Sequence, residues 1–159
     1  MILSGRDIKY YVETGLIKIN PVEKSQYQQN GIDLIISKII DKTMIDTNDT
    51  ISQTYTLFPL RFYLGATKEI LELPNNVMGF VELRSTWARR GLMIAPTIID
   101  AGFKGNLTVE IFSAGYEGPA PINERFLHVV FSLLTTPGDP YKGKYLNQSG
   151  VTGPIEWKS

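Results

Sequence analysis

Short apolar runs separated by turn residues recur along the chain and predict a mainly β fold. Apolar or alternating residues occupy 32–40, 55–64, 77–83, 107–112 and 126–134. Proline, glycine and asparagine gather between these runs, as they do in the turns that connect short strands. Regularly spaced strands of this kind favour a sandwich, a jelly roll or a distorted barrel.

The N-terminus carries the signals of one short helix. Ser4 suits the N-cap, and Asp7 stands where the acid of a capping box belongs. Gly15 can end the helix. The apolar stripe between them consists of Ile8, Tyr11 and Val12. Residues 41–54 are polar and predict a loop, and residues 138–159 predict an extended tail with little core of its own.

Composition narrows the possible classes of protein. The 159 residues suit a single domain, 1–159, and the 16 basic and 16 acidic side chains leave no basic excess for nucleic acid or an anionic membrane. Cysteine is absent, which excludes disulfides and thiolate chemistry. With no signal-peptide pattern and no long apolar run, we expect a soluble, cytoplasmic protein.

A polar cluster at residues 84–89 supplies candidate phosphate ligands. Arg84, Ser85 and Arg89 fall within one short polar turn. Guanidinium groups bind phosphate oxygens through charge-assisted hydrogen bonds. An isolated cluster of this type is more often a solvated turn, so other residues must decide between the two interpretations.

Two acids follow the cluster. Asp100 comes after an apolar pair and before a glycine-bounded turn, where partial burial would raise its basicity and suit it to general-base work. Capping of the turn is the simpler role. Strand alternation places Glu110 on the opposite face from Val109 and Ile111, so Glu110 is either a solvent-facing acid or a site residue.

Two segments resemble motifs of the dUTPase and dCTP deaminase superfamily. Residues 84–89, Arg-Ser-Thr-Trp-Ala-Arg, resemble its Arg-Ser-Ser-Leu-Ala-Arg motif. Residues 99–105, Ile-Asp-Ala-Gly-Phe-Lys-Gly, resemble its Ile-Asp-x-x-Tyr/Phe/Trp-x-Gly motif. Three weaker matches, at residues 30–34, 123–131 and 141–148, follow the order of the family. On these five matches the chain is identified as a member of this superfamily.

The resemblance implies a distorted jelly-roll β-barrel of the dUTPase type, assembled as a homotrimer. Active sites would lie between subunits, each closed by the C-terminal tail at residues 138–159. The ligand would be a pyrimidine deoxynucleoside triphosphate, dUTP or dCTP. Mg²⁺ would bind mainly through the substrate phosphates, with no metal site built from the protein.

The resemblance also assigns roles to individual residues. Asp100, Glu110, Ser85 and Arg89 are the expected catalytic residues, with Asp100 ordering the attacking water and Phe103 stacking under the deoxyribose. The expected nucleotide-binding residues are Arg84, Ser85, Thr86, Trp87, Ala88, Arg89, Asp100, Phe103, Thr108, Val109, Glu110, Arg125, Tyr141, Lys144 and Gln148.

Glu110 and the segment before Asp100 point to different reactions. The glutamate that matches Glu110 is the acid/base of dCTP deaminases, and most single-function dUTPases have an uncharged residue there. Deaminases, however, carry a longer connection with a Thr-Ala step whose carbonyl helps to hold the attacking water. In this chain the connection, residues 90–99, is short and lacks the Thr-Ala step, as in archaeal-type dUTPases. We give the connection more weight, because one additional acid cannot replace a missing carbonyl.

The sequence therefore predicts a dUTP diphosphatase that hydrolyses dUTP to dUMP and pyrophosphate. The alternatives are a dCTP deaminase, a bifunctional enzyme, and a nucleotide-sensing regulatory protein on the same fold. With His128 as its one histidine and no cysteine, the chain cannot build the zinc site of the ordinary cytidine deaminases. Residues 138–144 have P-loop spacing, but Tyr145 replaces the Ser or Thr that a P-loop needs.

Overall fold

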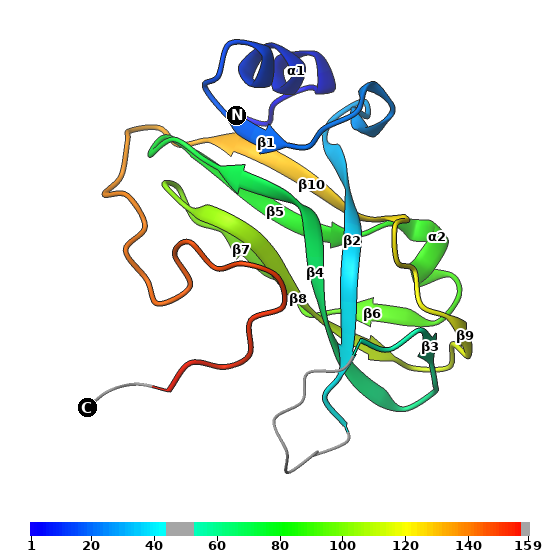
Figure 1. Cartoon of the computed structure of the whole chain (residues 1–159). Helices are drawn as coiled ribbons and strands as arrows, with labels where there is room; N and C mark the ends of the chain where they lie inside the picture. Colours follow the sequence, from blue (N-terminus) through cyan, green and yellow to red (C-terminus); the bar gives the residue numbers. More distant parts are fainter. Residues whose placement is uncertain (44–52, 157–159) are drawn as a thin grey trace.

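A curled antiparallel sheet with a helix packed at one end forms the body of the protein (Figure 1). The structure, a computed structural model, describes residues 1–43 and 53–156. Within these ranges eight strands form the main sheet in the order β6-β8-β4-β2-β10-β5-β7, with β1 paired to β4, while β3 and β9 form a separate ladder. The strands are β1 (Lys18–Asn20), β2 (Ile32–Asp41), β3 (Thr56–Leu57), β4 (Arg61–Glu72), β5 (Val77–Leu83), β6 (Leu92–Ile94), β7 (Thr97–Ile99), β8 (Lys104–Ser113), β9 (Gly118–Pro119) and β10 (Arg125–Leu133).

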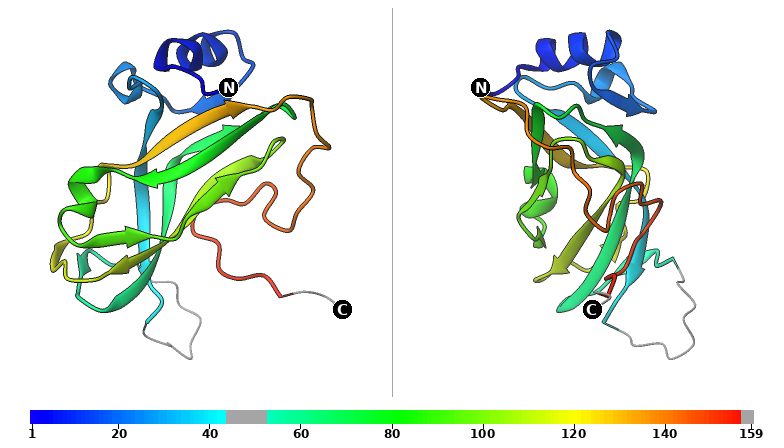
Figure 2. Two further views of the ribbon diagram at one scale, coloured as in Figure 1. Left: turned by 180° about the vertical axis from the view of Figure 1, so that it is seen from behind. Right: turned by 90° about the vertical axis from the view of Figure 1, so that its left-hand side faces the viewer.

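Two strands from opposite ends of the sheet path are neighbours in the chain. β6 ends at Ile94 and β7 begins at Thr97, so only Ala95 and Pro96 connect them. Such a link spans at most roughly 11 Å when fully extended. The sheet must therefore curl until its two edges approach each other, and this produces the half-closed barrel seen from behind and from the side in Figure 2.

The predicted N-terminal helix is confirmed as α1 (Gly5–Glu13). The Ser4 hydroxyl accepts a hydrogen bond from the Asp7 N–H at 3.2 Å, and the Asp7 carboxylate accepts one from the Ser4 N–H at 2.9 Å. These reciprocal bonds satisfy donors that the first turn leaves open. Gly15 follows the helix with a φ of 76°, a conformation that favours glycine, and ends it as expected.

The apolar run at residues 55–64, which contains Pro59, is divided between two strands. The chain forms β3, breaks at Pro59 and Leu60, and then starts β4 at Arg61. Proline has no N–H to donate to a ladder, and Leu60 adopts a φ of 59°, so neither residue continues a strand. The other four apolar runs are confirmed as β2, β5, β8 and β10. Residues 44–52 of the predicted loop lie outside the described residues.

A bulge interrupts β4 where it faces β8. Ala66 pairs with Thr108 and Ile70 pairs with Asn106, so residues 67–69 of β4 oppose a single residue of β8. The Thr67 hydroxyl accepts a hydrogen bond from the Leu107 N–H at 3.0 Å and replaces the missing ladder bond. The bulge therefore keeps the buried backbone paired while it bends the strand.

A buried acid lies at the end of this bulge. The Glu69 carboxylate accepts hydrogen bonds from the Ile35 N–H at 3.0 Å and from the Gln26 Nε2 at 2.7 Å. Gln26 belongs to the short 3₁₀ helix η1 (Lys24–Gln26). Burial raises the pKa of Glu69, and these hydrogen bonds only partly offset that effect.

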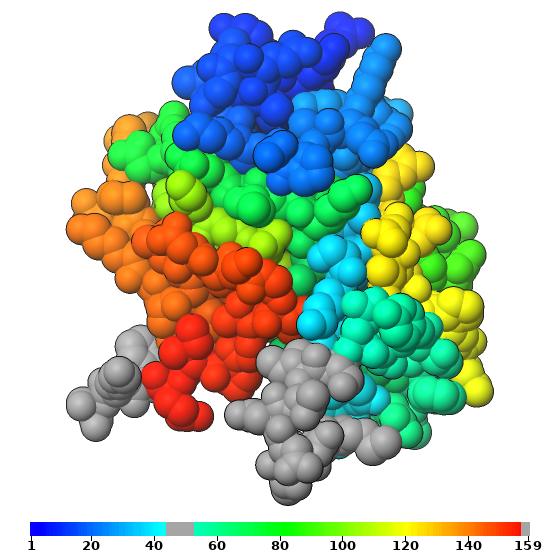
Figure 3. All heavy atoms as spheres, viewed as in Figure 1, coloured from blue at the N-terminus to red at the C-terminus, as the bar shows by residue number. Residues whose placement is uncertain are grey.

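The apolar core lies inside the curl of the sheet. Its largest fully buried side chains include Tyr63, Phe126, Phe131, Ile8 and Leu34. Beyond β10 the chain turns back along the sheet, and Figure 3 shows this tail packed as a continuous band across one face. No helix in residues 1–43 and 53–156 is long and apolar enough to cross a membrane.

Candidate functional site

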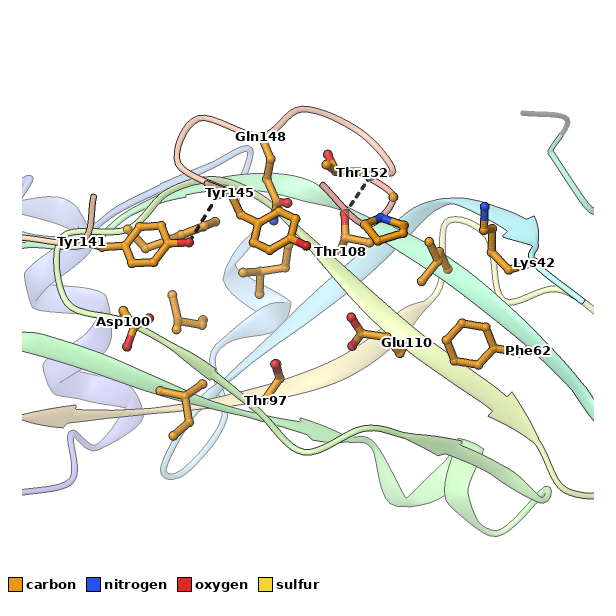
Figure 4. A pocket seen from close by; sticks show the side chains of 17 residues that line it. Lys42, Phe62, Thr97, Asp100, Thr108, Glu110, Tyr141, Tyr145, Gln148 and Thr152 are labelled. Atoms are coloured by element: carbon orange, nitrogen blue, oxygen red, sulfur yellow. Dashed lines mark hydrogen bonds between the residues drawn. The ribbon is translucent and has the colours of Figure 1, made fainter. Parts of the chain in front are cut away.

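A pocket of about 570 Å³ opens between β7, β8 and the tail. Its size suits a small-molecule ligand. In Figure 4, Asp100 lies toward one end, Lys42 and Phe62 lie toward the other, and Glu110 lies between them. The rest of the wall includes Thr97 and Ile98 from β7, Thr108 from β8, and Tyr141, Tyr145, Gln148 and Thr152 from the tail.

The two predicted acids both border this pocket. Asp100 follows the last residue of β7, and its side chain is exposed. The expected partial burial of Asp100 is therefore wrong for this chain, because the turn that carries it projects at the open mouth of the pocket. Glu110 is half-buried on β8, while Val109 is 1% and Ile111 is 0% exposed, so the predicted alternation is confirmed.

Glu110 faces the wall formed by β7. In Figure 4 its carboxylate points into the pocket on the side of Thr97. Within the described part of the chain neither Glu110 nor Asp100 forms an ion pair with Lys, Arg or His. The pocket therefore contains two carboxylates, and neither is paired with a basic side chain of the described residues.

An aromatic pair forms part of the pocket wall. Phe103 is 6% exposed, and its ring lies 6.0 Å from that of Tyr141 at an interplanar angle of 53°. The Tyr141 hydroxyl in turn accepts a hydrogen bond from the Tyr145 N–H at 3.3 Å. Phe103, the residue expected under the sugar, is thus held between the core and the tail.

The tail follows β8 residue by residue. The Asn147 N–H donates to the Lys104 carbonyl at 2.7 Å, and the Thr152 N–H donates to the Thr108 hydroxyl at 3.0 Å. Gly105 and Gln148 form a parallel bridge between these two contacts. The tail thereby occupies a backbone edge of β8 that β6 does not reach, since β6 pairs only with residues 111–113.

Two of the predicted arginines, Arg84 and Arg125, lie in a different place, around Asp33 on β2. The Asp33 side chain is 2% exposed, and its Oδ2 lies 3.0 Å from the Arg84 Nε and 3.7 Å from an Arg125 Nη1. The Arg84 contact is an ion pair without hydrogen-bond alignment. The Asp33 Oδ1 lies 3.0 Å from the His128 Nδ1, because the ladder between β2 and β10 places these two residues opposite each other.

A second cavity, of about 310 Å³, lies beside this arginine cluster, by which we mean Asp33, Arg84, Arg125 and His128. Ser85 lines the same cavity. A buried carboxylate shared by two guanidinium groups leaves the cluster with a net positive charge, which suits the binding of an anion.

The helix α2 (Ser85–Ala88) replaces the expected polar turn. Trp87 is 7% exposed and packs in the core against Phe126, and its Nε1 donates to the Arg125 carbonyl at 3.1 Å. The Ala88 N–H, an expected phosphate donor, is donated to the Arg84 carbonyl at 3.2 Å. Thr86 and Arg89 are exposed beside the cavity-lining Ser85.

The structure thus divides the predicted site residues into two groups. Asp100, Phe103, Thr108, Glu110, Tyr141 and Gln148 line the larger pocket, whereas Arg84, Ser85, Arg89 and Arg125 do not. Val109 and Lys144 stand apart from both groups, as do Thr86, Trp87 and Ala88 of α2, which line neither cavity. The Val109 side chain lies in the core, and the Lys144 ammonium donates to the Ile155 carbonyl at 2.6 Å along the tail.

Sequence reasoning missed several residues that the structure places at these sites. Lys42, Phe62, Thr97 and Thr152 line the pocket, and no motif match contains them. Tyr145 also lines it and falls within the motif match at residues 141–148. Asp33 had a usable signal, because it falls within the motif match at residues 30–34.

The described residues contain no group of three His, Asp or Glu side chains arranged to hold a metal ion. Mg²⁺ commonly keeps several water ligands and binds through one or two carboxylates together with substrate phosphates. The donors of the pocket, which include Asp100 and Glu110, fit a metal that arrives with a triphosphate.

Known proteins resemble both the sequence and the fold. The chain is 41% identical over 153 residues to a probable deoxyuridine 5′-triphosphate nucleotidohydrolase of Sulfolobus islandicus rod-shaped virus 1, with 96% of this chain and 97% of the viral protein covered. It is 42% identical over 168 aligned positions to a dCTP deaminase of Saccharolobus solfataricus, with 97% and 91% covered.

Solved structures confirm the expected dUTPase-type fold. The dCTP deaminase of Agrobacterium tumefaciens superposes with a TM-score of 0.70 at 17% identity, over 83% of this chain, which spans about half (47%) of that deaminase. The EIAV dUTPase superposes with a TM-score of 0.55 at 18% identity, over 80% of this chain and 96% of that enzyme. Residues 2–124 match the family model described as dCTP deaminase-like. With that match and relatives above 40% identity, the chain belongs to the dCTP deaminase-like family, as its motifs indicated.

Proposed function

We propose that the protein is a dUTP diphosphatase that releases dUMP and pyrophosphate. The short connection between the arginine motif and Asp100 is the observation that carries this proposal. β6, the Ala95-Pro96 link and β7 fill residues 92–99. The Ala95 N–H is donated to the Glu110 carbonyl at 3.2 Å, which fixes the link against β8. No further loop is present to supply the carbonyl that a deaminase of this family uses to hold its attacking water.

The lengths of the alignments support the same choice. The alignment with the viral relative spans 153 residues and 96% of the 159-residue chain, so it needs essentially no gap in this chain. The alignment with the Saccharolobus deaminase spans 168 positions, more than the chain contains. That deaminase therefore carries residues that this chain lacks, whereas the probable viral dUTPase has nearly the same length.

In the proposed reaction Asp100 takes up a proton from a water molecule that attacks the α-phosphorus. The bond between the α-phosphorus and the bridging oxygen breaks, and pyrophosphate leaves. An exposed carboxylate at the mouth of the pocket suits this role, because its position is reached from both the sugar site and solvent. Mg²⁺ carried on the triphosphate supplies charge neutralisation.

The arginines reach the triphosphate from a second copy of the chain. Two observations support a homotrimer with sites between subunits. The larger pocket has acids but no arginine in its wall, whereas the second cavity has Arg84 in its wall together with Asp33 and Glu82. The outer sheet faces also expose apolar pairs that oppose each other across ladders, such as Phe80 with Ile98 and Phe112 with Met93. Exposed apolar patches of this kind are typical of protein interfaces.

dCTP deamination is the second candidate, and Glu110 favours it. Its carboxylate points into the pocket with no basic partner among the described residues, as an acid/base that serves a pyrimidine ring would. Relatives named dCTP deaminase are also similar along nearly the whole chain, including one of Acidianus ambivalens at 40% identity. A bifunctional enzyme would combine both reactions.

One assay separates these proposals. The purified protein is incubated with dUTP or with dCTP, each with Mg²⁺, and both ammonia and pyrophosphate are measured. A dUTP diphosphatase releases pyrophosphate from dUTP and no ammonia from dCTP. Ammonia without pyrophosphate establishes the deaminase, both products establish the bifunctional enzyme, and tight dUTP binding without either product establishes a sensor.

A further inference from the structure

Asn106, which none of the motif matches singles out, connects the tail to the core. It lies on β8 opposite the bulge in β4 and is 8% exposed. Its Nδ2 donates to the Thr67 and Glu69 carbonyls, each at 3.0 Å. Its Oδ1 accepts a hydrogen bond from the Gly150 N–H of the tail at 3.2 Å. One side chain therefore links two segments that are far apart in the sequence.

The bulge determines which way this amide faces. Both groups on the core side are carbonyl oxygens, so the NH₂ end of Asn106 must point toward them. The oxygen end must then point toward the tail. The core thus holds a hydrogen-bond acceptor in one orientation before the tail arrives, and a preorganised acceptor loses little conformational entropy when it binds.

The backbone of Asn106 holds the neighbouring tail residue as well. The Asn106 N–H donates to the Gln148 carbonyl at 3.1 Å, and the Gln148 Nε2 donates to the Asn106 carbonyl at 2.7 Å. Gln148 and Thr152, on either side of Gly150, both line the pocket. The Asn106 contacts therefore act on the part of the tail that forms a pocket wall, although Asn106 itself does not border the pocket.

The surface of β8 allows the tail to approach closely. A Cβ atom on Gly105 would lie 2.7 Å from the Gln148 carbonyl oxygen, and one on Gly102 would lie 2.7 Å from the Pro140 Cα. Both glycines have positive φ values, 139° and 82°. These contacts join the tail to β8 and to the turn that precedes it in the same chain, so the chain closes its own pocket.

We propose that Asn106 is the positioning residue that fixes the tail over the pocket of its own chain. It acts through Gly150 and Gln148 and does not contact the nucleotide. The proposal rests on the proposed function only in taking this pocket as the nucleotide site. The bulge in β4 then determines the closed position of the tail, because its carbonyls bind the NH₂ group of Asn106 and so turn the Asn106 oxygen toward the tail.

Limited trypsin digestion without nucleotide tests the position of the tail directly. Lys142 and Lys144 are exposed cleavage sites ahead of the Asn106 contacts. We expect Asn106→Leu to increase the rate of cleavage in the tail by about tenfold, with the core fragment still resistant, because a released segment is cut in proportion to its open population. A tail rate equal to that of the wild type would overturn the proposal.

Thr67→Val is the matched control. The Thr67 hydroxyl accepts from the Leu107 N–H and donates to the Glu69 carbonyl at 2.9 Å, so Thr67→Val removes these side-chain bonds but keeps the Thr67 and Glu69 carbonyls that hold Asn106. We expect tail cleavage at the wild-type rate. If Thr67→Val releases the tail as much as Asn106→Leu does, general weakening of the sheet explains the effect and the positioning role is wrong.

Gly150→Ala tests the same contact from the side of the tail. Because this substitution leaves the core unaltered, it remains informative even if Asn106→Leu does not fold. Gly150 has a φ of 62°, which an alanine adopts only with strain, so we expect faster tail cleavage. The double variant should be cut no faster than the more sensitive single variant, because both changes remove one contact. Additive effects, or no effect of Gly150→Ala, would contradict the proposal.

Kinetics provide a second measurement. With dUTP, Asn106→Leu should raise KM and lower kcat, each by about tenfold, while Thr67→Val retains both near wild-type values. Unchanged kinetics in an Asn106→Leu protein whose tail is released would show that this position of the tail does not serve catalysis. Because digestion needs no nucleotide, failure of the tail proposal is distinguishable from failure of the dUTPase proposal.

Discussion

The pocket under the tail and the arginine cluster carry opposite charges and are stabilised in different ways. In the pocket, backbone ladders hold β7, β8 and the tail, and the two carboxylates are left without basic partners among the described residues. In the cluster, a buried carboxylate holds Arg84 and Arg125 in place through ion pairs. Under the proposed function the cluster would supply positive charge that binds the triphosphate, and the pocket would supply the carboxylate that activates water.

The largest expected effect is that of a substitution in the acidic pocket. Asp100→Asn should lower pyrophosphate release from dUTP by about 10³-fold, because an amide cannot take up a proton from water. Asp100 is exposed and has no ion pair to lose, so the melting temperature should stay at the wild-type value. Near-normal turnover by this variant would remove Asp100 from the mechanism.

Mixing two inactive variants tests whether the regions combine between subunits. Arg89 is outside the arginine cluster but ends the motif that begins at Arg84, and it is exposed, so Arg89→Ala should fold normally but release little pyrophosphate. Coexpressed with Asp100→Asn in equal amounts, it should restore about a quarter of wild-type activity, since each mixed trimer contains one intact site. If no activity returns although mixed oligomers form, the two regions act within one chain.

A smaller effect is expected at the centre of the pocket. Glu110→Gln should leave pyrophosphate release from dUTP within about tenfold of the wild type, or roughly 1.4 kcal/mol of transition-state stabilisation, because the reaction occurs at phosphorus. Any ammonia that the wild type releases from dCTP should disappear in the variant. Loss of both activities would place Glu110 in phosphate chemistry and contradict the proposed roles.

The smallest expected effect concerns stability rather than activity. The pKa of Glu69 is raised in the folded protein above its ordinary value of 4.5, so the folded state binds this proton more tightly than the unfolded state does. The free energy of unfolding should therefore fall as the pH rises from 4.5 through the raised pKa.

Glu69→Gln is the variant that removes the titrating group. Its amide oxygen in the Oε1 position keeps the bond from Gln26, whereas its NH₂ in the Oε2 position cannot accept the 3.0 Å bond from the Ile35 N–H. The variant's free energy of unfolding should change less between pH 4.5 and neutral pH than that of the wild type, because the variant has lost the group that titrates. Urea unfolding of both proteins across this range measures the difference. A constant difference at every pH would mean that Glu69 does not titrate there.

The apolar runs were enough to predict the positions of β2, β5, β8 and β10. The motif matches were enough to predict the family. The apolar pattern could not predict β6, β7 and β1, because three residues are too few to show a period. The second half of β4 was missed for another reason. Its Gly, Ala, Thr and Glu residues look like a polar turn, yet strands on both sides bury them.

The site was predictable residue by residue but not as an arrangement. The motifs marked Asp100 and Arg84, yet the sequence does not show that they border different cavities of one chain. The Asp33–His128 contact depends on the register between β2 and β10, which is a long-range property of the ladder. Asn106 carries no motif, and its role becomes visible only once the bulge and the tail are seen together.

The two-residue link between β6 and β7 has a consequence for how substrate range can change. β7 and β8 form two walls of the pocket, and the Ala95-Pro96 link ties β7 to the sheet edge that begins beside β8. The separation of these walls is thus limited by the length of a connection rather than by the size of any side chain. An insertion at this link would widen the cavity and bring in new backbone carbonyls at the same time, without altering a single residue of its present lining.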